Sequence, residues 1–221
     1  LKVYLITKLN NMRLLISFLF IALSFQSFAK ETETILTGRN AHEEIPGTEL
    51  IRYKSFSTVP AFIRFRADQT ISFTEWEEWM TQRYFKTSEG FSFQFLRSEE
   101  DELGMIHYRY QQAKDGFPLE FGVWLVHTKN GQVISMNGEM FDEVPSFKPS
   151  VSEEAALNLA MASVGADSYK WQIEAEEAHL KLEQNDPEAT YFPTGELVIV
   201  NRDPSLSEVD LSLAWKFNIY A

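Results

Sequence analysis

The histidine side chains of this chain are the groups whose spacing could indicate metal chemistry. Zinc hydrolases hold their metal with the pattern HExxH, and His42-Glu43-Glu44 begins this pattern, but the fifth residue is Pro46. His107 and His127 fall in predicted strands, and neither has a second histidine or a glutamate at zinc-motif spacing. We therefore expect no metal site, and we interpret His107 and His127 as sheet residues whose nitrogens bond to neighbouring groups.

The serine and carboxylate side chains give no catalytic pattern either. No serine lies in a G-x-S-x-G turn, and a nucleophile without a placed base is inert. The acidic run Glu99-Glu100-Asp101-Glu102 is typical of solvated surface, and no EF-hand spacing supports a calcium site. There is no cysteine for a disulfide or a thiolate site. We assign no catalytic, cofactor-binding or metal-ligating residue, and we expect the chain to be inactive as an enzyme by itself.

The composition indicates a folded protein of one or two domains. Hydrophobic residues make up 44% of the 221 residues and aromatic residues 14%, which is enough for packed cores. The formal net charge is −12. Nucleic acid is therefore excluded as a partner, because neutralising its phosphates requires a basic surface.

The N-terminal region has the features of a secretory signal peptide. Arg13 is followed by an apolar run over residues 14–25 and then by Ser27 and Ala29, the small residues that a signal peptidase reads. We expect cleavage between Ala29 and Lys30, because the apolar run is shorter than the roughly 20 residues that span a membrane. Removing residues 1–29 takes away three basic residues and no acid, so the formal charge changes from −12 to −15. The mature chain is then a secreted protein, extracellular or periplasmic, without a stable membrane span.

The clearest strand pattern lies within residues 105–138. Side chains alternate between two faces over residues 119–128, and a further strand is predicted over residues 105–112. Asn130-Gly131 follows, a dipeptide that favours a two-residue type I′ turn. This hairpin predicts three cross-strand pairs, Thr128 with Val133, Val126 with Ser135 and Trp124 with Asn137.

The elements before this hairpin complete a first unit over residues 50–144. Residues 30–49 are polar without a period, so we expect a flexible lead-in. Strands are predicted over residues 61–65 and 91–95, and an acidic turn over residues 98–102. Thr74 and Glu77 form a capping box, and Trp76, Met80 and Tyr84, spaced by four, mark one face of a helix that covers the sheet.

Several of these elements, in this order, resemble the fungalysin/thermolysin propeptide domain. The resemblance rests on the helix TISFTEWEEW, on YQQ followed by a Gly-x-Pro turn, on the apolar strand that ends at His127, and on the Asn-Gly hairpin. It covers approximately residues 50–144.

A second unit is predicted over residues 151–221, after a linker over residues 145–150 that contains two prolines. Ser150 or Ser152 can cap a helix whose apolar residues recur at helical spacing, and Gly165 is placed to end it. A short extended piece is predicted over residues 169–171, an acidic helix over residues 174–183, and strands over residues 196–200 and 211–220.

This second unit resembles the PepSY domain, which follows the first domain in the proregions of secreted thermolysin-family zinc metallopeptidases. The resemblance rests on SVSEEAALNLAMASVGA, ATYFPTGELVIV and LAWKFNIYA. In that family another hairpin and then the HExxH catalytic domain follow. We therefore expect an incomplete PepSY-like domain whose last strand keeps one unpaired edge, in the N-terminal piece of a larger precursor or in a truncated gene product.

The predicted fold is α+β, with two small domains that are each an antiparallel sheet covered by a helix, the second one cystatin-like. The resemblance implies a propeptide that acts as intramolecular chaperone and inhibitor, with the cognate metallopeptidase catalytic domain as its partner. Zinc, and calcium as a second candidate, belong by this resemblance to the catalytic domain and not to this chain. A free-standing secreted inhibitor or protein-binding module is the alternative, and an enzyme by itself is the third hypothesis.

Overall fold

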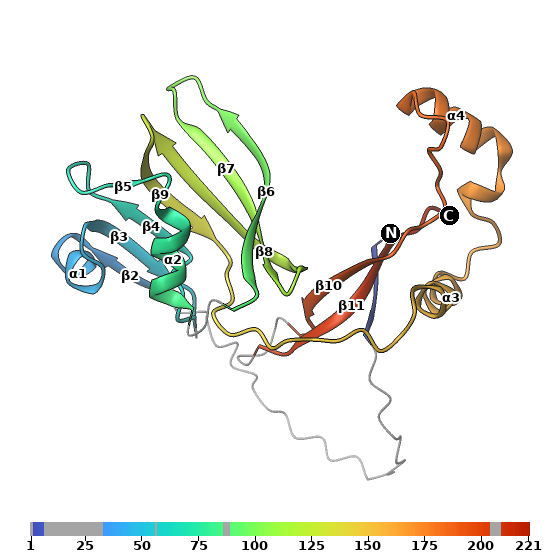
Figure 1. Cartoon of the computed structure of the whole chain (residues 1–221), viewed down its shortest axis with the longest axis horizontal. Coiled ribbons are helices and arrows are strands. Elements are labelled where there is room, and N and C mark those ends of the chain that lie inside the picture. Colours follow the sequence, from blue (N-terminus) through green and yellow to red (C-terminus); the bar gives the residue numbers. More distant parts are fainter. Residues whose placement is uncertain (1, 7–32, 56, 86–88, 204–208) are drawn as a thin grey trace, which may run out of the picture.

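The computed structural model describes residues 2–6, 33–55, 57–85, 89–203 and 209–221, and for residues 2–6 it describes the backbone alone. The chain adopts an α+β fold built on a mixed sheet (Figure 1). The predicted cleavage point between Ala29 and Lys30 lies outside the described residues. None of the described helices is long and apolar enough to cross a membrane.

Antiparallel strands make up the first part of the chain. In spatial order they are β2 (Thr34–Thr37), β3 (Thr48–Tyr53), β4 (Phe62–Phe65), β9 (Gln132–Gly138), β8 (Phe117–Lys129), β7 (Ile106–Lys114) and β6 (Phe91–Glu100), and the short β5 (Ile71–Ser72) pairs with β9. The strands predicted over residues 61–65, 91–95 and 105–112 are confirmed. β6 extends further than predicted, because Glu99 and Glu100, expected in an acidic turn, pair with β7.

Helix α2 (Trp76–Tyr84) covers one face of these strands, as its spacing predicted. Trp76 and Met80 are buried, and the ring of Trp76 lies 4.7 Å from that of Tyr110 in β7. The predicted capping box is wrong. The Thr74 hydroxyl lies 2.8 Å from that of Ser72 at the end of β5, and the helix begins at Trp76 without a side-chain cap.

Residues 33–49 form regular structure, although the sequence analysis places them in a flexible lead-in. β2 is followed by helix α1 (Gly38–Glu44), and the chain enters β3 at Thr48. Ala41 and Ile45 are buried in the core, and the Thr48 hydroxyl donates to the carbonyl of Ala41 at 2.9 Å. The segment is polar overall, but it contains two apolar side chains four positions apart, which lie on one face of a helix. Packing of these two side chains against a neighbouring sheet is enough to stabilise a short helix.

The Asn130-Gly131 hairpin is confirmed, but its register changes near the turn. Thr128 pairs with Val133 as predicted, whereas a bulge at Ile134 makes Val126 pair with Met136 and Trp124 with Gly138, in place of the predicted Ser135 and Asn137. Val133 and Met136 are both fully buried. An unbroken alternation would turn one of them to the opposite face, so the bulge brings a second apolar side chain into the core.

The second part of the chain contains α3 (Glu153–Val164), the 3₁₀ helix η1 (Lys170–Gln172), α4 (Glu174–Gln184), β10 (Glu196–Asn201) and β11 (Leu211–Asn218). α3 has the predicted ends, because the Ser152 side chain accepts from a backbone amide of the first turn and Gly165 adopts the left-handed conformation. The extended piece predicted over residues 169–171 is wrong, since most of it lies in η1. Figure 1 shows α4 standing away from the strands.

β11 has a strand on each side. β10 pairs with one edge, and β1 (Lys2–Ile6) pairs antiparallel with the other, from Lys2 opposite Asn218 to Ile6 opposite Ala214. The expected unpaired edge of the last strand is therefore wrong for this chain, because β1 satisfies backbone groups that an edge strand would expose. β1 belongs to the segment that the predicted signal cleavage would remove.

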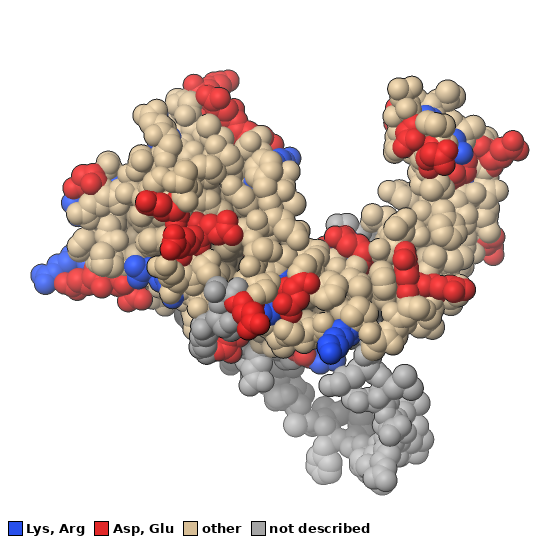
Figure 2. Space-filling view, viewed as in Figure 1, with Lys and Arg blue, Asp and Glu red and all other residues tan. Residues whose placement is uncertain are grey.

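The two sets of strands meet where β10 lies beside β8. Ile199 of β10 lies opposite Leu119 of β8 in parallel orientation. Both side chains are buried with Val144 in a small core, against which aromatic side chains including Phe117 and Phe147 pack. The two parts lie on either side of this junction in Figure 1, and Figure 2 shows a hollow between them. The arrangement as two domains, the second one cystatin-like and incomplete, stays a prediction.

Replacing Met80 by alanine tests the packing of α2. Met80 is fully buried, so Met80→Ala should lower the free energy of unfolding by about 2–5 kcal/mol. Urea titration followed by tryptophan fluorescence measures this change. The control is Gln82→Ala at an exposed position of the same helix, which should change the value by less than about 0.5 kcal/mol. Equal effects of the two substitutions would contradict the packing.

Candidate functional site

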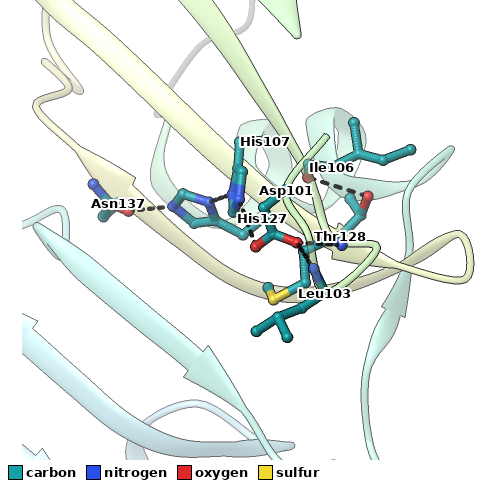
Figure 3. Close-up of polar contacts among 8 residues, drawn as sticks. Asp101, Leu103, Ile106, His107, His127, Thr128 and Asn137 are labelled. Atoms are coloured by element: carbon teal, nitrogen blue, oxygen red, sulfur yellow. Dashed lines mark hydrogen bonds and ion pairs between the residues drawn. The ribbon is translucent and has the colours of Figure 1, made fainter. Parts of the chain in front are cut away.

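Two histidines from neighbouring strands face each other in the first part of the chain. His107 of β7 lies directly opposite His127 of β8, and their Nδ1 atoms are 2.6 Å apart (Figure 3). Each ring also uses its other nitrogen. His107 Nε2 lies 3.2 Å from Asp101 Oδ2, and His127 Nε2 lies 2.7 Å from Asn137 Oδ1. The four side chains therefore form one continuous run of hydrogen bonds.

The partners of this run determine where its protons lie. A carboxylate and an amide oxygen only accept hydrogen bonds, so His107 Nε2 donates to Asp101 and His127 Nε2 donates to Asn137. One of the two facing Nδ1 atoms donates to the other, and the direction of this bond depends on the tautomers of the two rings.

Burial and nearby hydrogen bonds shift two pKa values in this run. Burial lowers the pKa of His127, the hydrogen bond to Asn137 acts in the opposite direction, and the charge of His107 lowers it further. The pKa of Asp101 is also lowered, chiefly because the backbone amide of Met105 donates to its carboxylate at 2.9 Å. Glu99, which pairs with His107 across the strands, forms an ion pair with Arg97. Asp101 is therefore the carboxylate that lies against the two rings.

Both ring nitrogens of His107 and of His127 are used in hydrogen bonds. The two facing Nδ1 atoms are engaged with each other, and within the described part of the chain no group of three or more histidine, cysteine, aspartate or glutamate side chains could hold a metal ion. His42 accepts from the amide of Gly47 at 3.1 Å, and His179 is exposed on α4. The interpretation of His107 and His127 as sheet residues with bonded neighbours is confirmed.

Two consecutive glutamines in β7 bond to the main chain. Gln112 is fully buried, its Nε2 donates to the carbonyl of Phe141 at 2.6 Å, and its Oε1 accepts from the amide of Phe141 at 3.0 Å. The side-chain amide of Gln111 donates to the carbonyls of Leu119 and Gly122, the latter at 2.9 Å. The two glutamines of the YQQ element, Gln111 and Gln112, therefore fix the backbone of β8 and the backbone of the segment that follows β9.

The segment of β8 to which Gln111 bonds is an irregular bulge over residues 119–122. Gln111 pairs with Val123 and Ala113 with Pro118, so the residues between them on β8 have no regular pairing with β7. Within the bulge Phe121 adopts the left-handed conformation, with φ 69°, and is 67% exposed. This conformation costs a residue other than glycine about 1–2 kcal/mol. Because a bulge redirects its strand, it also turns Leu119 toward β10.

A partly buried ion pair closes the junction beside the bulge. Lys216 of β11 places its Nζ 3.1 Å from Glu120 Oε2 and 2.6 Å from Glu196 Oε2. Burial acts against the charge on Lys216, but the two carboxylates outweigh it and raise its pKa. Lys216 therefore connects the bulge to β10. Elsewhere on the face seen in Figure 2, acidic side chains lie over both parts and basic ones are few.

The strands that carry these side chains are predicted from the sequence, but several of the hydrogen-bond and ion-pair partners are not. Asp101 falls in an acidic run that is typical of solvated surface, and Asn137 is predicted only as the cross-strand neighbour of Trp124. Glu120 and Lys216 are far apart in the sequence, so nothing in it pairs them. The available signal is the pair Gln111-Gln112 inside an apolar strand, because polar groups that are buried need hydrogen-bond partners.

The lowered pKa of His127 should make stability depend on pH. Below its unfolded value near 6.5 the unfolded chain binds more protons than the folded chain, so the free energy of unfolding should decrease as the pH falls from about 7 toward 5. The limit for one proton is about 1.4 kcal/mol per pH unit. Urea titrations at about pH 7.5 and 5.5 should show a smaller decrease for His127→Gln than for the wild type. His179→Gln is the control and should keep the wild-type pH dependence, and an unchanged dependence in His127→Gln would show that this ring does not govern it.

Removal of the Gln112 side chain should weaken the first part of the chain. Gln112→Ala leaves the amide and the carbonyl of Phe141 without their partner and opens a cavity, so we expect a loss of about 2–4 kcal/mol in the free energy of unfolding. Gln94→Ala, at an exposed position of β6, is the matched control. Chemical denaturation of both variants measures the difference, and a loss no larger than that of the control would count against the two bonds.

A model of a known protein family matches the segment that carries these features. The model, described as the fungalysin/thermolysin propeptide motif, matches residues 91–140, from the start of β6 to just after β9. The match includes both histidines, both glutamines and the bulge, and spans under a quarter of the chain. No curated protein matches the chain. In this segment the chain is therefore similar to the propeptides of fungalysin- and thermolysin-type peptidases.

Proposed function

We propose that this chain is the propeptide region of a secreted zinc metalloendopeptidase precursor of the thermolysin type. In this role it assists the folding of the catalytic domain and inhibits it until the two are separated. The observation that carries the proposal is the propeptide motif over residues 91–140, which implies association with a cognate peptidase catalytic domain. Zinc belongs in this proposal to the catalytic domain.

A propeptide of this kind acts through binding. A preformed surface that binds the folded partner and not the unfolded one stabilises the folded partner, and the same contacts can block its active site. While both parts belong to one chain, the effective concentration of the propeptide is high, and cleavage between them removes this advantage. The required property is a surface of fixed shape. The hydrogen bonds of Gln111, Gln112 and the two histidines supply such a fixed framework in β7–β9.

The remaining parts of the chain take their roles from the same proposal. Residues 1–29 export the precursor and are removed between Ala29 and Lys30, and residues 151–221 are a PepSY-like domain. The charge of −12, and of −15 after cleavage, favours a partner with a basic surface, because complementary charge speeds association.

An inhibition and refolding experiment tests the function. The purified chain, shown by gel electrophoresis to remain intact, should lower the rate of casein hydrolysis by a thermolysin-type peptidase. It should also raise the yield of active enzyme when the denatured catalytic domain is refolded with it, because binding stabilises the folded state. A serine peptidase, which has an unrelated fold, is the control and should not respond. No effect on either the rate or the yield would contradict the proposal, and inhibition without a refolding effect would favour a free-standing inhibitor.

A further inference from the structure

Phe121 combines two features that are unfavourable for a phenylalanine. Its backbone is left-handed, with φ 69°, and its side chain is 67% exposed. The other described non-glycine residues with positive φ are Asp115, Asn130 and Asn185. Asp and Asn tolerate this region because their short polar side chains bond locally, whereas a phenylalanine gains nothing from it. Strained backbone of this kind is a mark of functional positions.

The backbone around Phe121 is held on both sides. The side-chain amide of Gln111 donates to the carbonyls of Leu119 and Gly122, the first and last residues of the bulge. Leu119 is buried against Ile199, and a Cβ added at Gly122 would lie 2.9 Å from the Leu119 Cβ, so the chain is tightly packed there. Phe121 is therefore presented to solvent by a preformed support, which lowers the ordering cost of any complex it makes.

The charges next to Phe121 permit its burial in a complex. Glu120 is only 13% exposed and already bonded to Lys216. A partner that covers Phe121 would not leave this neighbouring carboxylate as an unpaired buried charge, which is the usual penalty at an interface. An exposed aromatic ring on a rigid support, with a carboxylate beside it that is already paired, has the properties of an interface anchor.

We propose that Phe121 is the anchor by which this chain binds the peptidase catalytic domain, inserting its ring into an apolar pocket on that domain. The inference rests on the proposed function and adds the contact surface to it. The catalytic domain is the occupant because Phe121 lies inside the segment, residues 91–140, that matches the propeptide motif. Gln111 is a positioning residue for this anchor, since it acts through the backbone of the bulge.

Substitution of Phe121 separates binding from stability. Phe121→Ala and Phe121→Gly should each raise the inhibition constant against a thermolysin-type peptidase by about tenfold or more, as expected for an anchor. Phe121→Gly should keep or raise the melting temperature, because glycine adopts positive φ without strain. Phe95→Ala is the matched control, since Phe95 lies in the same motif and is 57% exposed in β6, and it should leave inhibition within about twofold of the wild type.

The possible outcomes distinguish this inference from the proposed function. If the wild type inhibits and the Phe121 variants inhibit equally well, the anchor is wrong and the propeptide function stands. A lower melting temperature in Phe121→Gly together with lost inhibition would show a structural role instead. Sedimentation that finds a wild-type dimer and a monomeric Phe121→Ala would assign the ring to a second copy of this chain. A wild type that neither inhibits the peptidase nor raises its refolding yield would overturn both proposals.

Discussion

The hydrogen bonds from Gln111 to the bulge of β8 are the constraint on which the arrangement of this chain depends. In a regular antiparallel pair, β8 (Phe117–Lys129) would pair with β7 along its whole length. The bulge interrupts this pairing at the residues where β8 lies beside β10. Gln111 stabilises the interruption, because its amide satisfies the carbonyls of Leu119 and Gly122 that lose regular partners. β8 then pairs with three strands, with β7 on both sides of the bulge, with β9 after it and with β10 at Leu119.

The polar side chains of β7–β9 are used for internal structure. Gln112 fixes Phe141 as the chain leaves the sheet, and His107 and His127 bond to each other in the middle of a run that Asp101 and Asn137 terminate. A buried polar group without a partner costs more than a satisfied one contributes, so each of these bonds selects one conformation over its alternatives. This part of the chain is thereby given a defined shape, which the proposed propeptide function requires.

The sequence predicted what local patterns determine and missed what distant contacts determine. The hairpin at Asn130-Gly131, the cover helix and the ends of α3 follow from turn chemistry, helical spacing and capping residues, and all three are present. The bulge at Ile134 depends on the burial of Met136 in the core. The position of α1 depends on packing against a neighbouring strand. Pairing of β1 with β11 joins the two ends of the chain. In the candidate site, the Gln111-Gln112 pair was visible in the sequence, but its acceptors were not.

The position of Phe121 beside the junction connects binding to the integrity of both parts of the chain. Its bulge is held from the first part by Gln111 and from the second part by Ile199 and Lys216. Loss of β10 and β11 would expose Leu119 and leave Glu120 without Lys216, and both changes would loosen the backbone that presents the ring. A cut in either part would therefore weaken an anchor at Phe121 even where the cut leaves the ring itself untouched. If the chain inhibits as proposed, it should lose affinity through damage at many positions, because the bulge is supported from both parts of the chain.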